Sequence, residues 1–433
     1  MTPYSLLQSA TAAALTLTAV MISGPVRGAE KVLIIGDSLS KEYEIEWLGI
    51  GGDPFSRPVE NWCEILDNRR GDWFEFGGSG TYSDSRLVGH AYNWAIPGSE
   101  TSDWVSLLKN PPGDLTNQLK KEVNRVVVFL GGNDVRVKYQ DLYDGKPAAE
   151  WIAGISGNIA QVLDFVKTQN PALPVVLANV PHLGGAPDID GDHPYDPVKT
   201  ARVTAALDEL NARLTVMVKE RGMGLADIYS MTRELVTSPR WVISGYKVEK
   251  TSSSSGSPNA LFLGDGFHPN MPAQAVFAQR IVDAFNDRYG SQIPRLGSRE
   301  ILVDVMGVSA DFPLSKWAEN FGIPSSSRGA TADPDQDGIP NIVEYTLDLD
   351  PARADNQLLP RPVVSGQNLT LTWQPRDPSG THSGLTVQES ADLQNWTTVP
   401  TGSISNLEFN TLRISRSLNA GQPLWLRFQA RTK

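Results

Sequence analysis

The chain has 433 residues and a formal net charge of −11, with 40% hydrophobic and 20% charged residues. This length is enough for two or three domains with packed cores, and the composition excludes a wholly disordered chain. Its 49 acidic residues outnumber 38 Lys and Arg and no basic run occurs, which argues against a nucleic-acid partner. The single cysteine, Cys63, excludes an intramolecular disulfide and a thiolate metal cage, and we expect it to be a buried small hydrophobe.

The N-terminus has the pattern of an export signal. Residues 10–22 read ATAAALTLTAVMI, an apolar run too short to span a bilayer but long enough for the core of a signal peptide. Small residues follow, which predicts a signal peptide over 1–28 and cleavage near Gly28 or Ala29. The alternative is an apolar N-terminal helix of the fold. We therefore expect an exported protein (periplasmic, cell-surface or extracellular) with no transmembrane segment.

Residues 30–290 alternate short β-rich runs with longer helical ones, as a parallel α/β sheet requires. Continuous apolar runs, typical of strands buried on both faces, occur at 32–35, 125–130, 174–180 and 224–229. Helices are predicted at 149–168, at 203–218 and after Pro272. An acidic insertion at 183–197 and a low-complexity stretch at 251–259 are predicted to be loops.

The sequence changes character after Gly290. Residues 291–355 are predicted to be a linker that contains a helix at 314–322 and an acidic loop. Residues 356–433 alternate apolar and polar positions with period two, and the apolar positions of two of the runs are Leu369, Leu371 and Trp373, and Leu424, Leu426 and Phe428. We therefore expect a small, antiparallel, sandwich-like all-β domain at the C-terminus.

Two motifs offer a nucleophile and a base. The run KVLIIGDSLS places Ser38 just after a buried strand, at the edge where open α/β sheets bind ligands. In the run LGDGFHP, Asp265 precedes His268 by three residues, so one turn of chain can bring the carboxylate to the imidazole. A carboxylate on Nδ1 fixes the tautomer and leaves Nε2 free to deprotonate a serine. For this second motif alone, the alternative is a surface turn capped by Asp265.

Two further segments offer donors for a developing oxyanion. FLGGND ends a predicted strand at the same sheet edge, and the Asn133 side-chain amide can donate there. NWAIPG ends another predicted strand, and Gly98 would let its backbone N–H approach the same oxygen closely. We expect Asp134 to cap or brace its turn rather than act on substrate.

Together these four blocks resemble the SGNH hydrolase (GDSL esterase/lipase) superfamily, in the order that this family has, over about residues 30–290. The resemblance implies a three-layer α/β/α, flavodoxin-like domain around a parallel sheet of about five strands. It also implies a nucleophile, Ser38, a general base, His268, and an orienting carboxylate, Asp265. The oxyanion hole would comprise the Ser38 and Gly98 amides and the Asn133 side chain. The aromatic-rich segment 73–94 and the insertion at 183–197 depart from the family pattern.

Other catalytic classes fit less well. No Gly-x-Ser-x-Gly elbow occurs, which argues against an ordinary α/β-hydrolase. Ser38 and Lys41 match the Ser-x-x-Lys of penicillin-recognising enzymes and Ser156 begins a Ser-Gly-Asn, but their third motif fails at Lys250. Retaining glycosidase chemistry needs two facing carboxylates, and no pair stands out.

An acidic loop follows the predicted catalytic domain. DPDQDG and a glutamate after five more residues fit the pattern D-x-D-x-D-G-x5-E, in which alternating oxygens converge on a hard cation. The predicted ligands are Asp333, Asp335, Asp337, the Ile339 carbonyl, Asn341 and Glu344. Pro340 departs from the EF-hand, and the run resembles thrombospondin type 3 or dockerin-like calcium repeats. A structural Ca²⁺ is expected, and the alternative is a solvated acidic linker.

The C-terminal domain resembles modules that end many exported bacterial enzymes, especially at 388–399. Trp396 and Trp425 are either core residues or platforms for sugar rings, and secretion or surface attachment is an equal alternative. We expect a carboxylic ester hydrolase with no catalytic cofactor, acting on an O-acetylated polysaccharide or oligosaccharide. A lipase, arylesterase or thioesterase of the same superfamily, and a calcium-dependent surface binding protein with an inert hydrolase domain, are the alternatives.

Overall fold

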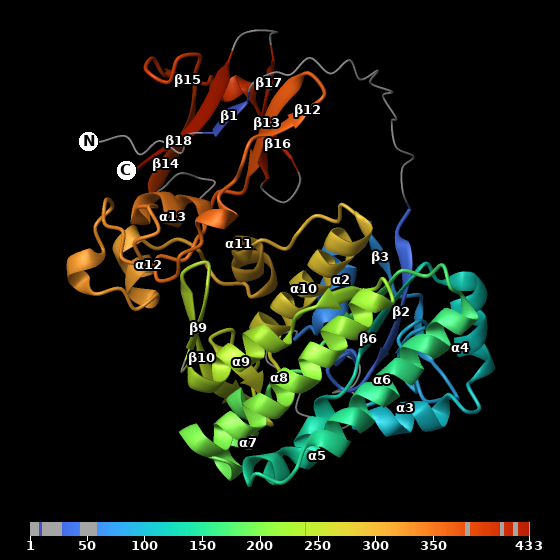
Figure 1. Ribbon diagram of the computed structural model, residues 1–433. Coiled ribbons are helices and arrows are strands. Elements are labelled where there is room, and N and C mark those ends of the chain that lie inside the picture. Colours follow the sequence, from blue (N-terminus) through green and yellow to red (C-terminus); the bar gives the residue numbers. More distant parts are fainter. Residues whose placement is uncertain are drawn as a thin grey trace. The chain divides into compact units, whose positions relative to one another are not determined.

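The computed structural model describes residues 8–10, 28–43, 59–238, 240–376, 382–407, 411–418 and 423–432 (Figure 1). The chain divides into two compact units. The larger unit comprises Val26–Trp241 and Val248–Leu296, and the smaller unit Met1–Pro25, Val242–Lys247 and Gly297–Lys433. The predicted export signal lies outside the described residues except for 8–10 and Gly28, and it stays a prediction.

A five-stranded parallel sheet forms the centre of the larger unit, in the order β3-β2-β6-β7-β8. Its strands are β2 (Glu30–Gly36), β3 (Phe74–Glu75), β6 (Arg125–Phe129), β7 (Val175–Ala178) and β8 (Gly224–Ala226). Every residue of β6 and β7 is buried, which explains their continuous apolar sequences. The predicted parallel α/β fold is confirmed.

Helices cover both faces of this sheet. On one face α3, α6 and α8 pack against one another, with α5 against α8; on the other, α10 packs against α2, β7 and β8 (Figure 1). The helices are α2 (Trp62–Arg70), α3 (Thr101–Leu107), α4 (Gly113–Asn117), η1 (Gln118–Glu122), α5 (Gly132–Tyr143), α6 (Ala149–Gln169), η2 (Leu183–Gly185), α7 (Pro187–Asp192), α8 (Pro197–Glu220), α9 (Tyr229–Thr237) and α10 (Met271–Tyr289). The three helices predicted from the sequence are therefore present as α6, α8 and α10.

Three local predictions were wrong. The strand predicted at 224–229 stops at Ala226, because the Asn179 side-chain oxygen accepts the amides of Ile228 and Tyr229 and starts α9 there. The insertion predicted to be a loop contains η2 and α7, and α7 begins with Pro187. The loop predicted at 251–259 is wrong only in its first three residues, which belong to strand β10 (Tyr246–Ser253), whereas residues 254–259 connect β10 to β11 (Ala260–Leu263), with which it pairs.

The segment before Gly98 is also not a strand of the main sheet. β5 (Val88–His90) pairs with β4 (Ser79–Thr81) in an antiparallel ribbon. Beyond it, Asn93 makes a parallel bridge to Ile34 of β2. The Ile34 amide donates to the Tyr92 carbonyl, and the amides of Trp94 and Ile96 donate to the carbonyls of Ile34 and Gly36. The segment therefore runs beside β2, as the sequence predicts, without forming a regular strand.

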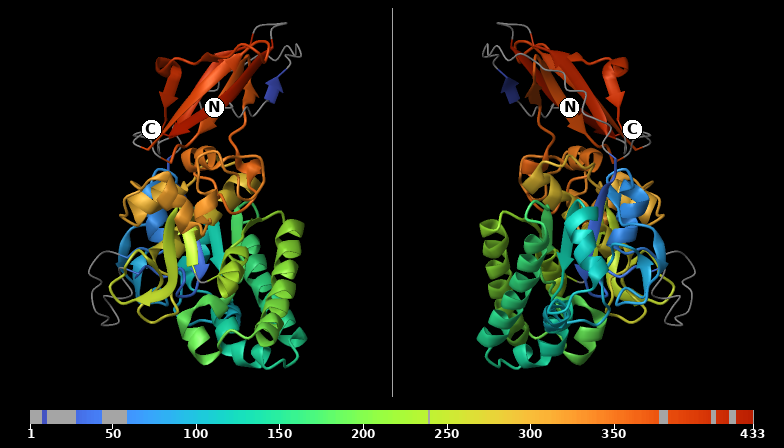
Figure 2. Two further views of the ribbon diagram at one scale, coloured as in Figure 1. Left: turned by 90° about the vertical axis from the view of Figure 1, so that its left-hand side faces the viewer. Right: turned by 90° about the vertical axis from the view of Figure 1, so that its right-hand side faces the viewer.

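Two antiparallel sheets form the β region of the smaller unit (Figure 2). One has the order β1-β18-β14-β15, with β1 (Gln8–Ala10), β14 (Ser383–Ser390), β15 (Thr397–Thr398) and β18 (Leu424–Thr432). The other has the order β12-β13-β17-β16, with β12 (Val363–Ser365), β13 (Asn368–Trp373), β16 (Ile404–Asn406) and β17 (Leu412–Ser417). The predicted C-terminal all-β region is confirmed.

The core of the smaller unit joins these strands to helices from residues predicted to be a linker. These elements are α11 (Ser298–Glu300), η3 (Ile301–Val305), α12 (Leu314–Asn320), η4 (Ser325–Ser327), α13 (Asn341–Leu347) and η5 (Asn356–Leu358). Trp317 and Tyr345 pack edge to face in the same cluster as Leu371, Trp373 and Phe428. Residues 314–347 are thus part of a packed domain.

The two tryptophans considered as sugar platforms are both half-buried. The Trp396 indole N–H donates to the Leu393 carbonyl at 3.1 Å, and the Arg427 guanidinium lies 4.1 Å from a Trp396 ring centre. Because Arg427 already stacks on Trp396, one face of this ring is occupied within the domain.

His182 is a buried histidine of the larger unit, 3% exposed. Its Nδ1 accepts the Gly184 amide at 3.1 Å, so the neutral ring carries its proton on Nε2, 3.0 Å from the Thr204 hydroxyl. Burial is the main cause that lowers the pKa of His182 from 6.5 to about 4. The folded state therefore holds this imidazole neutral where an unfolded chain would protonate it.

This histidine is expected to make folding sensitive to mild acid. Below about pH 6.5 the unfolded chain binds a proton that the folded chain excludes until about pH 4, so the free energy of unfolding falls across this window, by roughly 3 kcal/mol in total. Urea unfolding of the parent chain and of His182→Gln between about pH 7 and about pH 4 measures the effect. Equal losses in the two chains would show that His182 does not contribute.

No helix among the described residues combines the length and the apolarity that a membrane span needs.

Candidate active site

Ser38 lies in a turn directly after β2, at the carboxyl end of the parallel sheet. The Asp37 carboxylate accepts the Leu39 amide at 2.9 Å, and the Ser40 amide donates to the Asp37 carbonyl at 3.0 Å. A Cβ at Gly36 would lie 2.7 Å from the Ser40 side chain, so only glycine allows the chain to turn this tightly. The turn therefore fixes a serine hydroxyl at the sheet edge.

The Asp37 side chain is buried behind the serine. Burial raises its pKa to about 7, although the Leu39 amide opposes the shift. Its Oδ2 has no hydrogen-bond partner among the described residues. Asp37 therefore shapes the turn through Oδ1 and is held away from solvent.

His268 meets Ser38 from a loop that follows β11. Its Nε2 lies 2.8 Å from the Ser38 Oγ, and its Nδ1 is hydrogen-bonded to the Asp265 Oδ2. The second Asp265 oxygen accepts the amides of Phe267 at 2.9 Å and His268 at 3.0 Å. The carboxylate is thus fixed by its own loop, and it orients the imidazole towards the hydroxyl.

Asp265 remains ionised in this setting. Burial alone would raise its pKa, but the hydrogen bond and charge of His268, together with the Phe267 and His268 amides, outweigh burial and lower the pKa. An ionised carboxylate keeps the Nδ1 proton in place and stabilises the imidazolium that forms when Nε2 takes up a proton. Ser38, His268 and Asp265 can therefore act as a nucleophile, a general base and its orienting group.

The predicted oxyanion donors come from neighbouring segments of the same edge. β6 pairs with β2 up to Phe129 opposite Gly36, and α5 then begins at Gly132, which puts Asn133 in its first turn. The Asn133 Nδ2 donates to the Ser99 carbonyl at 3.0 Å, and an amide group has a second N–H besides this one. Gly98 has φ +76°, a conformation that favours glycine, and it precedes this same Ser99.

Asp134 braces the neighbouring helix. Its Oδ2 accepts the Thr101 amide at 2.9 Å and its Oδ1 the Thr101 hydroxyl at 2.6 Å, at the start of α3. Asn158 on α6 donates to the same hydroxyl at 3.1 Å. Asp134 therefore holds the loop that carries Gly98 and Ser99, which agrees with the bracing role expected for it.

A family model described as the GDSL-like lipase/acylhydrolase family matches residues 34–276, more than half of the chain. The chain belongs to this family. No curated protein matches the chain.

The solved structures to which this GDSL-family chain is similar are distant from it. Phospholipase A1 from Streptomyces albidoflavus NA297 is 16% identical, with a TM-score of 0.34, over 60% of this chain and 100% of that one. A family 3 carbohydrate esterase from Clostridium thermocellum is 14% identical, with a TM-score of 0.33, over 61% and 100%. The lipase Lip_vut3 from a goat rumen metagenome is 14% identical, with a TM-score of 0.37, over 59% and 97%.

The sequence did not reveal what supports the His268 loop in this GDSL-family domain. The Arg136 guanidinium of α5 lies 4.4 Å from the Phe267 ring centre and forms an ion pair with Asp188 of α7 at 2.9 Å. The Asp188 amide also donates to the Gly266 carbonyl at 3.0 Å. The acidic insertion therefore supports the loop of the general base, which its composition alone did not indicate.

A small cavity is lined by sequence neighbours of Ser38 and His268, and not by Ser38, Asp265 or His268 themselves. It has a volume of about 40 Å³ and an almost wholly apolar lining that includes Leu39, Phe267 and Pro269, the sequence neighbours of Ser38 and His268. Leu183 and Leu235 also line this cavity.

The geometry argues against the competing serine mechanism. The Lys41 ammonium is buried and donates to the carbonyls of Arg86 at 2.9 Å and Val88 at 2.5 Å, where it cannot serve as a base for Ser38. The Ser156 hydroxyl donates to the Ile152 carbonyl within α6. Cys63 is buried and burial raises the pKa of its thiol, as expected of a residue that serves packing.

The predicted calcium ligands lie together in the smaller unit. Carboxylate oxygens of Asp333, Asp335 and Asp337 lie within 4.8 Å of one another. A second group joins Asp337 and Glu344 to Asp355, which the sequence motif did not include. The Ile339 amide donates to the Asp337 carboxylate at 2.8 Å, and the Asn341 Nδ2 donates to the carbonyls of Ser327 and Gly329.

Proposed function

We propose that this protein is an exported serine ester hydrolase that acts through an acyl-enzyme. The observation that carries the proposal is the hydrogen-bonded chain from the Ser38 Oγ through His268 to Asp265. Ser38 attacks the ester carbonyl carbon while His268 Nε2 takes up the hydroxyl proton. His268 then returns this proton to the leaving alcohol. In the second half of the reaction, His268 takes a proton from a water molecule that attacks the acyl carbon, and it returns this proton to the Ser38 oxygen as the acyl-enzyme bond breaks.

The negative charge of each tetrahedral intermediate needs donors at the sheet edge. We assign this role to the Ser38 and Gly98 amides and to the Asn133 side chain. Ser38 follows β2, Asn133 lies in the first turn of the helix after β6, and Gly98 lies in a neighbouring loop. Removal of one such donor typically costs about 2.7–4 kcal/mol of transition-state stabilisation. The hydrogen bond from Asn133 to the Ser99 carbonyl supports the role, because it holds the amide in a fixed orientation.

The substrate that we propose is an O-acetyl ester of a polysaccharide or oligosaccharide. The small cavity beside Leu39 and Phe267 supports a short acyl group, since a long chain needs a much larger apolar volume. The chain has more acidic residues (49) than basic ones (38) and a separate β domain. Both features are typical of secreted enzymes that act on polymers, and by this analogy they support a carbohydrate as the alcohol portion of the substrate. The alternative is a lipase or arylesterase of the same family, favoured by the apolar lining of the same cavity.

Chain-length dependence tests the acyl group. We expect turnover of p-nitrophenyl esters to fall at least about tenfold from acetate to octanoate, because added methylenes do not fit a cavity of about 40 Å³. Acetate release from acetylated xylan, with Ser38→Ala as the blank, tests the carbohydrate. Equal or faster turnover of octanoate without acetate release from xylan would favour the lipase alternative.

A further inference from the structure

Glu344 is a buried carboxylate without a partner. It lies in the first turn of α13, its side chain is 0% exposed, and neither of its oxygens has a hydrogen-bond partner among the described residues. A charged carboxylate in this position needs a cation or a proton, because burial removes its hydration. None of the described ion pairs supplies a basic side chain to it.

Other carboxylates converge on Glu344. One oxygen each of Glu344, Asp337 and Asp355 lie within 4.8 Å of one another. The Asp355 amide donates to Asp337 Oδ2 at 3.0 Å, and the Asp350 amide donates to Asp355 Oδ2 at 2.9 Å. The carboxylates of Asp337 and Asp355 are thus held in place by the backbone, and the Asp355 Oδ1 has no partner among the described residues.

The electrostatics of the cluster agree with this geometry. Burial, together with Asp335, Asp337, Asp355 and Asp333, raises the pKa of Glu344 to about 9. Burial, opposed by the Asp350 amide, raises the pKa of Asp355 to about 6. Without a cation, these groups repel one another unless they bind protons.

We propose that Asp337, Glu344 and Asp355 together bind one calcium ion, with Asp333 and Asp335 completing an acidic shell. The cluster offers oxygen atoms and no imidazole or thiolate, which suits a hard cation. Ca²⁺ accepts six to eight oxygens in flexible geometry, whereas Mg²⁺ demands a tight octahedron and retains its waters. Asn341, whose Oδ1 is buried and without a described partner, and the Ile339 carbonyl are the further ligands expected from the loop.

Asp355 gives this ion a role that the loop motif alone does not. It follows Glu344 by eleven positions and directly precedes η5, after which the chain enters β12. The ion would therefore join the acidic loop and α13 to the segment that enters the β-sandwich. A single cation would offset the repulsion among the carboxylates of Asp337, Glu344 and Asp355, because each of them would be attracted to the ion.

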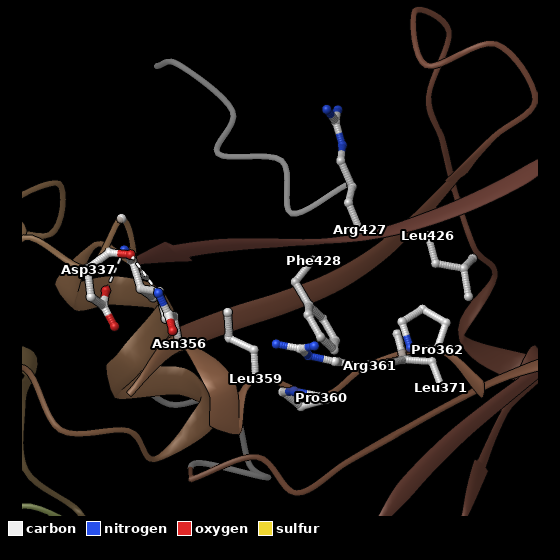
Figure 3. Close-up of a pocket in the computed structure, with 12 residues that line it drawn as sticks. Asp337, Asn356, Leu359, Pro360, Arg361, Pro362, Leu371, Leu426, Arg427 and Phe428 are labelled. Atoms are coloured by element: carbon white, nitrogen blue, oxygen red, sulfur yellow. Dashed lines mark hydrogen bonds between the residues drawn. The ribbon is translucent and has the colours of Figure 1, made fainter. Parts of the chain in front are cut away.

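The site also adjoins a pocket of the β region with a volume of about 380 Å³ (Figure 3). Asp337 and Asn356 lie at one end of this pocket and Leu426, Pro362 and Leu371 at the other (Figure 3). The Asn356 side chain donates to the Asp337 carbonyl at 3.3 Å, so movement of Asp337 changes the shape of that end. Calcium is therefore expected to order the pocket wall as well as the loop.

Calcium titration of the full chain tests the proposal. Isothermal titration calorimetry of the EGTA-treated and desalted protein with CaCl₂ measures binding, and differential scanning calorimetry with CaCl₂ or EGTA measures the thermal transitions. The variants are Glu344→Gln and Asp355→Asn, and Glu319→Gln is the matched control because its carboxylate lies on α12 in an exposed pair with Lys316. MgCl₂ at the same concentrations tests the choice of cation.

We expect the parent chain and Glu319→Gln to bind one calcium ion and to gain roughly 5–10 °C in the Tm of one transition when calcium is a hundredfold above Kd. Glu344→Gln should lose the binding heat and the gain, but melt in EGTA at or above the parent temperature, because its neutral amide needs no proton. Asp355→Asn should bind at least about tenfold more weakly.

Three results would overturn the proposal. The first is a parent chain with neither binding heat nor a calcium-dependent Tm, and the second is parent-like affinity in Glu344→Gln. The third is parent-like affinity in Asp355→Asn, which would remove Asp355 from the ligand shell. Because none of these measurements depends on ester turnover, they are independent of the proposed enzymatic function.

Discussion

Ser38→Ala is expected to lower kcat for p-nitrophenyl acetate by a factor on the order of 10⁶. The hydroxyl is the only group of the site placed to form the acyl-enzyme, since its Oγ lies 2.8 Å from the His268 Nε2. The residual rate would come from substrate binding and the oxyanion donors. Initial rates at saturating ester, with the melting temperature as a check on folding, measure the effect.

The matched control for this prediction is Ser156→Ala. Its hydroxyl donates to the Ile152 carbonyl inside α6, so its removal should leave turnover within about twofold of the parent chain. A Ser38→Ala chain that retains parent activity would contradict the acyl-enzyme mechanism. Absence of Ser38-dependent turnover in the parent chain would instead favour a binding protein with an inert hydrolase domain.

Asp265→Asn is expected to lower kcat by about 10⁴ with little change in KM. The carboxylate accepts the proton on His268 Nδ1 and so leaves Nε2 free as a base. An amide in its place can donate to Nδ1, which moves the ring proton to Nε2, where it blocks transfer from Ser38. Steady-state kinetics measure the split between kcat and KM.

Asp164→Asn is the control for this carboxylate-to-amide change. Asp164 pairs with Arg221 on the exterior of the larger unit, far in sequence from the catalytic loop. Its loss should leave kcat within about twofold, because exposed ion pairs contribute little. Similar kcat values for Asp265→Asn and Asp164→Asn would show that Asp265 does not orient the base.

The parts of the fold that could be predicted depend on short-range patterns. Strands β2, β6 and β7 are continuous apolar runs, and Asp265 and His268 are close in sequence, so their geometry follows from one turn of chain. The meeting of Ser38 and His268, 230 positions apart, was predictable only from the resemblance of their motifs to a known family, because the strand before His268, β11, belongs to a separate three-stranded sheet. Both kinds of signal are contained in a few consecutive residues.

Contacts between distant loops could not be predicted in this way. Arg136 stacks on Phe267 because α5 and the His268 loop adjoin in space, and Asp355 reaches the acidic loop because of how the chain enters β12. The missed helix α7 is different, because Pro187 and the acids of its first turn were available as helix-start signals. The many acidic residues and the glycines of the insertion at 183–197 favoured its interpretation as a loop.

The assignment of residues Val242–Lys247 to the smaller unit limits how this protein can be divided. Within that unit, Arg376 donates to the Ser244 carbonyl at 3.1 Å and Asn320 to the Gly245 carbonyl at 2.8 Å. A fragment that stops at Leu296 would keep the six hairpin residues and lose these partners, leaving two backbone acceptors and the surface beneath Trp317 bare. Gene truncation or a single protease cut near Leu296 therefore does not yield two self-sufficient halves, because the smaller unit depends on a segment that is encoded within the larger one.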